Sequence, residues 1–90
     1  MEKGIITVIG KDTVGIIAKV CTYLADHNVN ILDISQTIIQ GYFNMMMVVD
    51  ITNPTQPLNT MIRDLDAMGE DIGVKIHFQH TEIFEKMHRL

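Results

Sequence analysis

The chain has 90 residues, of which 47% are hydrophobic, and a formal net charge of −4 at pH 7. This length suits one domain, residues 1–90, with a modest core. The acidic balance argues against nucleic acid, because phosphate binding needs clustered Lys and Arg and the basic residues here are scattered. The single cysteine, Cys21, excludes an intrachain disulfide and suits a reducing compartment. No signal-peptide core follows Met1 and no apolar run approaches the length of a membrane span, so we expect a cytoplasmic protein.

The first half of the chain predicts a strand, a helix and a hairpin. Residues 3–10 are rich in β-branched residues and apolar on both faces, which is typical of a central strand. A helix is expected over 13–28, with Asp12 or Thr13 as its cap and Asn28 ending it in the left-handed region. Its expected buried stripe contains Val14, Ile17, Ala18, Cys21, Leu24 and Ala25, and Ile16, Val20 and Tyr23 widen it.

A β-hairpin is expected from strands 31–39 and 42–52, joined by Gln40-Gly41. Strict alternation in the first of these strands groups Leu32, Ile34 and Ile38 on one face and puts Ile31 with Ile39 on the other. In the second strand, one face collects the apolar residues Phe43, Met45, Met47, Val49 and Ile51. We interpret the Met45-Met46-Met47 run as adaptable packing rather than as a metal site.

The second half predicts another helix, a fourth strand and a short terminal helix. Thr55 is expected to cap the helix with Pro57 in its first turn, and Gly69 or Gly73 is expected to end it. Residues 73–79 form the expected strand, with Val74, Ile76 and Phe78 pointing inward. A last helix is expected over 81–88.

The resulting order, β-α-β-β-α-β, predicts an α+β domain with the ferredoxin-like arrangement: a four-stranded antiparallel sheet with both helices on one face. The opposite face of the sheet carries many apolar residues, which monomers seldom expose as a continuous patch. We expect burial in a homodimer or higher homo-oligomer, through the sheet face or through sheet edges. The alternatives are a mixed face that stays solvated and a C-terminal segment that folds over part of it.

The stretch from Val8 to Asp33 is the candidate ligand site. A strand enters a turn bracketed by Gly10 and Gly15, a helix follows, and an Asn-rich turn leads to the next strand. We expect this unit to place Asp12, the N–H groups of the turn and Asn30 near one another at one end of the sheet. Gly10 is expected to permit an unusual backbone angle, and Gly15 to let the first helical turn approach the sheet.

The chemistry of this candidate site favours a small ligand that carries both a carboxylate and an ammonium group. N–H groups at a helix start can bind a carboxylate, and an Asn amide offers a donor and an acceptor. Walker A spacing and the dinucleotide glycine triplet are missing, so a nucleotide is not expected. No cofactor or metal is expected either, because the histidines sit on separate predicted elements and Cys21 lies in an apolar stripe. No nucleophile has an evident base, so we do not expect an enzyme.

Three segments resemble the ACT domain, the small regulatory module of amino-acid-metabolism enzymes and regulators. They are the stretch from Gly10 to Ile16, Ala18 with Leu24-Ala25, and the stretch from Val29 to Asp33. The resemblance covers nearly the whole chain and is closest to stand-alone bacterial and archaeal ACT proteins, akin to half of the tandem regulator of the glycine cleavage operon.

This resemblance implies side-by-side dimers with amino-acid sites at their interface and an allosteric, regulatory role. Carried over by position, the ligand contacts are Gly10, Asp12, Gly15 and Asn30, with Ile31 and Leu32 offering backbone groups. Many amino-acid-binding members have a neutral residue where Asp12 stands, and a carboxylate there would favour the ammonium of a ligand. The alternative function is a ligand-free interaction module that pairs with an ACT-bearing enzyme or regulator.

Overall fold

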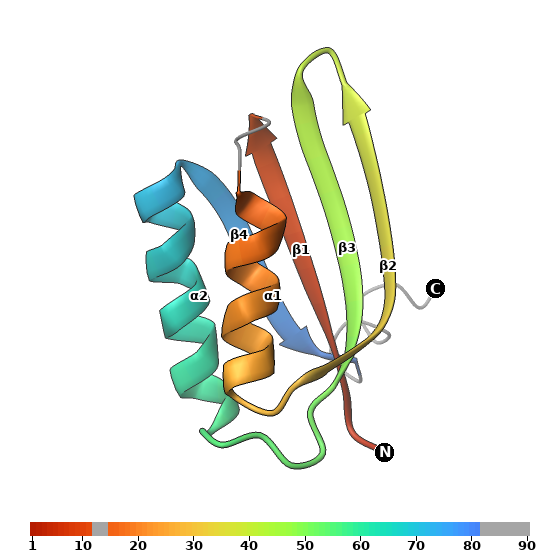
Figure 1. Cartoon of the computed structure of the whole chain (residues 1–90), viewed down its shortest axis with the longest axis vertical. Coiled ribbons are helices and arrows are strands. Elements are labelled where there is room, and N and C mark those ends of the chain that lie inside the picture. Colours follow the sequence, from red (N-terminus) through yellow and green to blue (C-terminus); the bar gives the residue numbers. More distant parts are fainter. Residues whose placement is uncertain (12–14, 82–90) are drawn as a thin grey trace, which may run out of the picture.

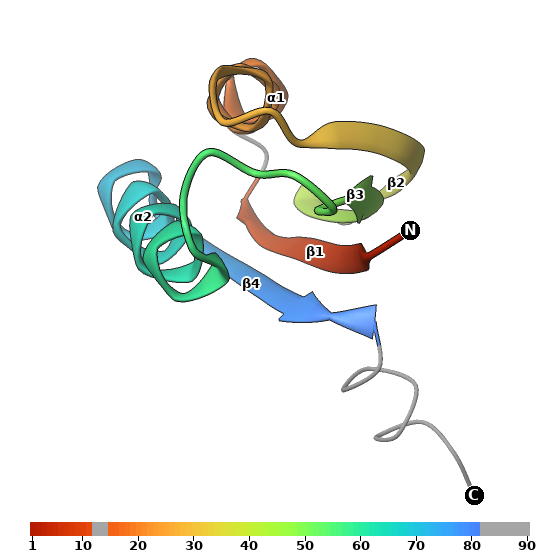
Figure 2. The ribbon, with the colours of Figure 1, turned by 90° about the horizontal axis from the view of Figure 1, so that it is seen from below.

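The computed structural model describes residues 1–11 and 15–81, which form a four-stranded sheet and two helices. In chain order the elements are β1 (Lys3–Lys11), α1 (Ile16–Asp26), β2 (Asn30–Ile39), β3 (Tyr42–Asp50), α2 (Leu58–Ile72) and β4 (Val74–His80). The strands lie in the order β2-β3-β1-β4, and every neighbouring pair is antiparallel. Both helices cover the same face of the sheet (Figures 1 and 2). The predicted ferredoxin-like fold is therefore confirmed, whereas the helix expected over 81–88 lies, beyond Thr81, outside the described residues.

The core lies between the sheet and the helix layer. Along β3 burial alternates strictly, so that Met45 and Met47 are fully buried while Met46 between them is 41% exposed. This confirms the face assignment made from the sequence for that strand. The other fully or nearly buried core side chains from β1, the helices and β4 are Ile6, Val8, Ile16, Val20, Leu24, Met61, Leu65, Ile76 and Phe78.

The buried stripe of α1 differs from the expected one. The helix begins at Ile16 and buries Ile16, Val20 and Leu24, whereas Ile17 is 36% exposed and Ala18 and Ala25 are also exposed. The three buried residues were all within the widened stripe, but its expected centre was wrong. Apolar residues occur nearly all round this helix, so spacing alone did not select the face. What selects it is the sheet, which α1 covers on one side only.

The hairpin turn and the turns at the two ends of α2 are partly as expected. Gly73 ends the helix with a φ of 92°, and Gln40 and Gly41 form the hairpin turn with φ values of 52° and 81°, as the sequence indicated. The expected Thr55 cap is wrong, because the residue that precedes the helix is Pro57. Thr55 instead binds the end of α1: its N–H donates to the His27 carbonyl at 3.0 Å, and its hydroxyl lies 2.9 Å from His27 Nδ1.

A β-bulge changes the facing of β2. Ile31 pairs with Val49 and Asp33 pairs with Val48, so Leu32 is an extra residue without a partner in the ladder. Consequently Ile31 lies on the helix side with Ile34, and it packs against the core. The strict alternation that placed Ile31 with Ile39 was therefore wrong, since one inserted residue reverses the facing of everything before it.

Candidate ligand-binding site

The two glycines that bracket the first turn have exchanged the roles expected of them. Gly10 is an ordinary strand residue of β1, and a Cβ built on it would lie 2.7 Å from Val74 Cγ1 of β4. Gly15 precedes α1 with a φ of 89°, and a Cβ there would meet open space. Close packing therefore requires glycine at position 10, whereas backbone conformation requires it at position 15. The sequence located both positions but could not tell which constraint applied to which.

The start of α1 has the electrostatic character expected of an anion-binding turn. Gly15 caps the helix and carries no side chain that could accept a bond from the first-turn N–H groups. The Gly15 carbonyl accepts the first helical bond, from Lys19 N at 2.9 Å. The positive end of the helix dipole therefore lies beside this turn. Asp12, the remaining predicted contact here, lies outside the described residues.

Asn30 occupies the other end of α1, at the start of β2. It lines a shallow hollow of about 230 Å³ together with Ala25, Asn28 and Val29. Asn28 has a φ of 60°, as expected, and its side-chain amide donates a 2.7 Å hydrogen bond to the Asn53 carbonyl, which holds the turn. Asn30 is exposed, so its amide is accessible to a ligand. The neighbouring candidate Leu32 is 40% exposed.

The expectation that the first turn and Asn30 share one corner of the sheet is wrong for a single chain. Gly10 pairs with Phe43 and Asn30 pairs with Asp50, so their positions along β3 differ by seven residues (50 − 43 = 7). At about 3.4 Å per residue the separation is about 24 Å. The reason is that α1 carries the chain back along the sheet from one turn to the other (Figure 1). The predicted contacts therefore form two half-sites, Gly10 with Gly15 at one end and Asn30 with Ile31 and Leu32 at the other.

The half-site at Asn30 begins β2, which is an edge strand with little cover, whereas the half-site at Gly10 and Gly15 lies on β1 and α1, level with the other end of β2. The helices cover the β1–β4 side of the sheet, and the β2–β3 hairpin extends past them (Figure 1). Ile34 and Ile38 face the helix side, opposite Met47 and Phe43, yet they are 43% and 59% exposed. These two residues form an apolar margin along the open edge, which we call the β2 margin.

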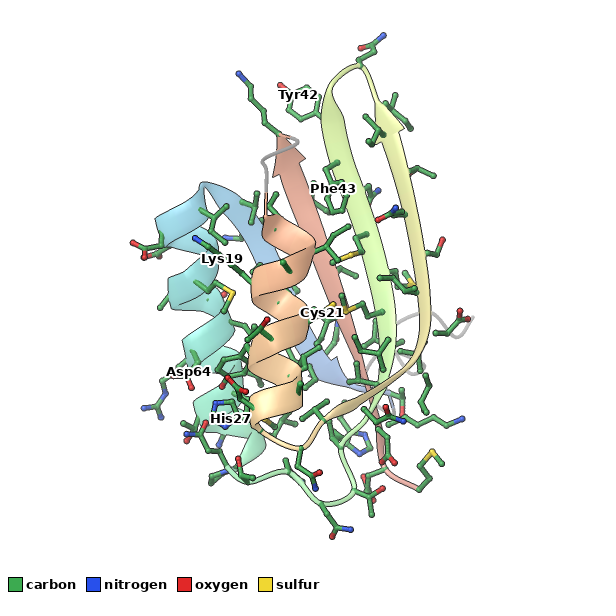
Figure 3. The ribbon with its side chains drawn as sticks, viewed as in Figure 1. Lys19, Cys21, His27, Tyr42, Phe43 and Asp64 are labelled. Atoms are coloured by element: carbon green, nitrogen blue, oxygen red, sulfur yellow. The ribbon has the colours of Figure 1, made fainter. Side chains whose placement is uncertain are left out.

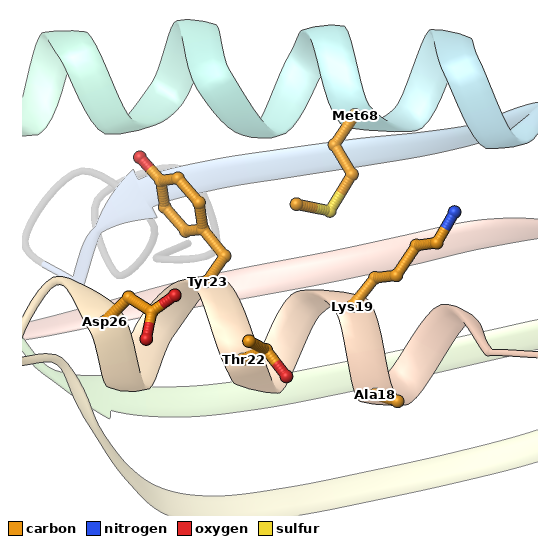
Figure 4. A pocket seen from close by; sticks show the side chains of 6 residues that line it. All are labelled: Ala18, Lys19, Thr22, Tyr23, Asp26 and Met68. Atoms are coloured by element: carbon orange, nitrogen blue, oxygen red, sulfur yellow. The ribbon is translucent and has the colours of Figure 1, made fainter.

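Sequence reasoning missed a groove between α1 and α2, which encloses about 400 Å³. Tyr23 bounds it and donates a 2.6 Å hydrogen bond to Asp64, while its ring lies 4.3 Å from that of His27. Burial, assisted by the Asp64 carboxylate, raises the pKa of the Tyr23 phenol far above its usual value, so the phenol remains a donor. Figure 4 shows the side chains that line the groove: Ala18, Lys19, Thr22, Tyr23, Asp26 and Met68. None of the predicted site residues is among them.

The histidines and the acidic side chains of the described residues are dispersed over the structure. Within residues 1–11 and 15–81, no group of three or more His, Cys, Asp or Glu side chains could hold a metal ion. His27 contacts Thr55 and Tyr23, and His80 pairs with Glu2. In the same part of the chain, no helix has the length and apolar character to cross a membrane.

The fold, the glycine turn and the open edge strand define a class of regulatory, small-molecule-binding domains. A family model described as the ACT domain matches residues 3–79, and the chain belongs to this family. Members of the family are generally non-catalytic.

Relatives span the whole chain. It is 63% identical over 90 residues to a UPF0237 protein of Bifidobacterium longum, and the match covers 100% of both sequences. The solved ACT domain protein from Streptococcus pneumoniae is 43% identical and superposes with a TM-score of 0.80, covering 93% of this chain and 94% of that one. A structure assigned as a glycine cleavage system transcriptional repressor is 21% identical and superposes with a TM-score of 0.71. The match covers 88% of this chain and 45% of that one, and it shows a shared fold alone.

Proposed function

We propose that two copies of the chain associate side by side through β2, and that each end of the seam binds a free amino acid. One observation carries this proposal: the two half-sites lie at opposite ends of the sheet, and its edge strand β2, which begins at Asn30, is uncovered along its length. In a single chain they are about 24 Å apart, too far to contact one small ligand. A two-fold axis brings the opposite ends of two such strands together.

The register of the sheet places the first turn level with one end of β2. Lys11, Tyr42 and Ile39 are paired across β1, β3 and β2, so the first turn lies at the Ile39 end of β2. When a two-fold axis relates two edge strands, they run antiparallel and each end faces the opposite end of its partner. The partner's Asn30 then lies at the end that holds the first turn. The β2 margin supplies apolar surface for the same contact.

The chemistry of the composite site suits a zwitterion. The α1 N-terminus attracts a carboxylate, and the Asn30 amide can donate to the carboxylate or accept from the ammonium. Ile31 and Leu32 contribute backbone groups beside it, and the Asp12 carboxylate would favour an ammonium. Because both chains line the site, binding couples ligand occupancy to the angle between them, which is the physical basis for a regulatory role.

A thermal-shift screen of the common amino acids tests this function. A ligand that binds only the folded dimer stabilises it by about 2.7 kcal/mol at 100 times its Kd. This stabilisation raises the melting temperature. Asn30→Ala should abolish the shift. The matched control is Asn44→Ala, an exposed strand asparagine on the other face of the sheet, which should keep it. A shift that survives Asn30→Ala would place the ligand elsewhere.

Mixed dimers test the shared site directly. Asp12→Ala and Asn30→Ala should each abolish binding alone. In a mixed dimer of the two variants, one site carries both substitutions and the other carries neither, so half of the sites in that dimer are restored. Calorimetric titration of the mixture should recover binding. If each site were built within one chain, mixing would recover nothing.

The alternative function uses the same open edge. In place of a second copy, β2 would pair with the ACT domain of an enzyme or regulator, with no ligand involved. An absence of any amino-acid shift, together with co-purification of an ACT-bearing protein that is lost on Ile38→Glu, would favour this alternative. We rank it second because the β2 margin is apolar, and a two-fold axis would place two copies of it against each other.

A further inference from the structure

The face of the sheet that is turned away from the helices carries a second apolar surface. Figure 2 shows both helices on the opposite side. On this outer face Ile9 is 49% exposed, Met46 is 41% exposed and Tyr42 is 56% exposed. Tyr42 lies at the hairpin end of the sheet (Figure 3). These residues are separate from the β2 margin, which faces the helix side.

The register of the three strand pairs arranges the outer face in rows that run from β4 to β2. The middle row has Thr7 and Met46 at its centre, on the two inner strands. Antiparallel partners share a face, so each row is a line of neighbouring side chains. Three rows cross all four strands, and from the hairpin end they are Lys75-Ile9-Asn44-Thr37, His77-Thr7-Met46-Ser35 and Gln79-Ile5-Val48-Asp33; the shorter row Lys11-Tyr42-Ile39 lies beyond the first.

Opposite charges occupy opposite corners of this pattern. Lys75 lies at the β4 end of the first row and Asp33 at the β2 end of the third, and both are exposed. They are three strand spacings apart across the sheet, about 14 Å, and four residues apart along it, also about 14 Å. The line that joins them therefore crosses the strands at about 45° and passes over the Thr7–Met46 pair at its midpoint.

We propose that the outer face binds the outer face of a second copy of this chain. A two-fold axis in the plane of the interface, perpendicular to the line from Lys75 to Asp33, places each Lys75 over the partner's Asp33. The same operation turns the strands by about 90°, which is one of the two common ways in which sheets pack face to face. Met46 lies at the centre of this contact, and the two charge pairs lie at its rim.

This inference is independent of the amino-acid site, because it uses the other face of the sheet. Charge complementarity fixes the orientation more than the affinity, since rim pairs steer association and penalise wrong registers. The apolar centre at Met46 and Ile9 supplies the burial. The competing occupant of this face is the segment 82–90 of the same chain, and the experiment separates the two.

Sedimentation equilibrium of the Ile38→Glu variant, in which the β2 seam is blocked, tests the proposal. This protein should be a dimer through its outer face. Lys75→Asp added to it should raise the dissociation constant about 10-fold or more, because two like-charge contacts replace two attractive ones. The double exchange Lys75→Asp with Asp33→Lys should restore the dimer. Matched controls on the helix layer, Lys19→Asp and Asp66→Lys, should leave the dissociation constant unchanged.

Three results would overturn the inference. One is a monomeric Ile38→Glu protein, a result that leaves the proposed β2 dimer and its ligand site intact. Another is a dimer that is indifferent to Lys75→Asp, or is not restored by the double exchange. The third is an Ile38→Glu protein that dimerises only when the chain is ended after Thr81, which would mean that residues 82–90 occupy the face. Conversely, amino acids that fail to bind would remove the proposed function and leave this contact standing.

Discussion

Tyr23 of α1 and Asp64 of α2 are joined by a 2.6 Å hydrogen bond across the groove between the two helices. The phenol also lies 3.4 Å from the Gln56 side chain, in the loop that precedes α2. On its other side the Tyr23 ring stacks at an angle on His27, which in turn binds Thr55. This chain of contacts links the end of α1 to the start of α2, so both helices keep a fixed position over the sheet.

Tyr23→Phe removes the donor and leaves the partly buried Asp64 carboxylate without this bond. We expect a loss of about 1 kcal/mol in the free energy of unfolding, since a bond to a charged acceptor is worth more than a neutral one but solvent screens part of it. Urea denaturation followed by circular dichroism measures the loss. Tyr42→Phe, at a tyrosine that is 56% exposed, is the matched control and should change stability little. Equal losses in both variants would contradict this role for the bond.

Gly10→Ala and Gly15→Ala should both destabilise the fold, for different physical reasons. At position 10 the new methyl group overlaps Val74, which lies 2.7 Å away, and overpacking of this kind costs about 1–3 kcal/mol. At position 15 the cost is about 1 kcal/mol and arises from the backbone, because φ is 89° and the space is open.

A double-mutant cycle with Val74→Ala separates these two causes. The smaller residue relieves the shortest contact, so Gly10→Ala should cost about 1 kcal/mol less in that background. Gly15→Ala should cost the same in both backgrounds. A coupling of Val74 to position 15, or none to position 10, would reverse the assignment of the two roles.

Local patterns in the sequence were sufficient for the fold and for most turns. Alternation along β3 identified its buried face, and Gln40-Gly41 and Gly73 marked the hairpin and the end of α2, because these features depend on neighbours in the chain. The bulge at Leu32 and the buried face of α1 were not predictable in this way. A bulge depends on pairing with Val48 and Val49 of another strand, and α1 is apolar nearly all round, so its orientation is set by the sheet.

The candidate site was only partly predictable for a similar reason. Its residue types and their places at the ends of α1 could be read from spacing. Their distance could not, because a helix that connects two strands must carry the chain back along the sheet, and the expectation of one shared corner overlooked that length. The Tyr23–Asp64 contact joins residues 41 positions apart in the chain, and no periodicity encodes such a pair.

Asp50 should contribute a pH-dependent part of the stability. The Thr52 hydroxyl and, to a lesser degree, the Thr52 backbone N–H donate to its carboxylate and hold its pKa below the usual value. A carboxyl group with a depressed folded-state pKa stabilises the protein above its unfolded-state pKa, and this contribution is lost as the pH falls through the folded-state value.

Thermal unfolding of wild type and Asp50→Asn at several pH values measures this contribution. Asp50→Asn should therefore melt below wild type at neutral pH, and the difference should shrink at pH values under the usual Asp pKa of about 4. Asp66→Asn on the exposed side of α2 is the control. A difference that is constant with pH would show that the carboxylate charge is not involved.

Asn28 should tolerate glycine better than alanine. Its φ of 60° favours residues without a Cβ, and its amide bonds the Asn53 carbonyl at 2.7 Å. Asn28→Gly loses only the amide bond, whereas Asn28→Ala also strains the backbone by about 1 kcal/mol. Thermal unfolding of the two variants measures the gap between them. If alanine proved equal to glycine, the left-handed conformation would carry no cost at this turn.

The unpaired residue in β2 makes the length of the chain adjustable at one place. Deleting Leu32 would leave Ile31 opposite Val49 and Asp33 opposite Val48, so the ladder would close without turning any later side chain to the wrong face. Deleting a residue from the middle of the strand, such as Gln36, would invert the facing of everything on one side of the gap. Beside the hollow lined by Asn30, the backbone can therefore lose a residue while the rest of the sheet keeps its pairing.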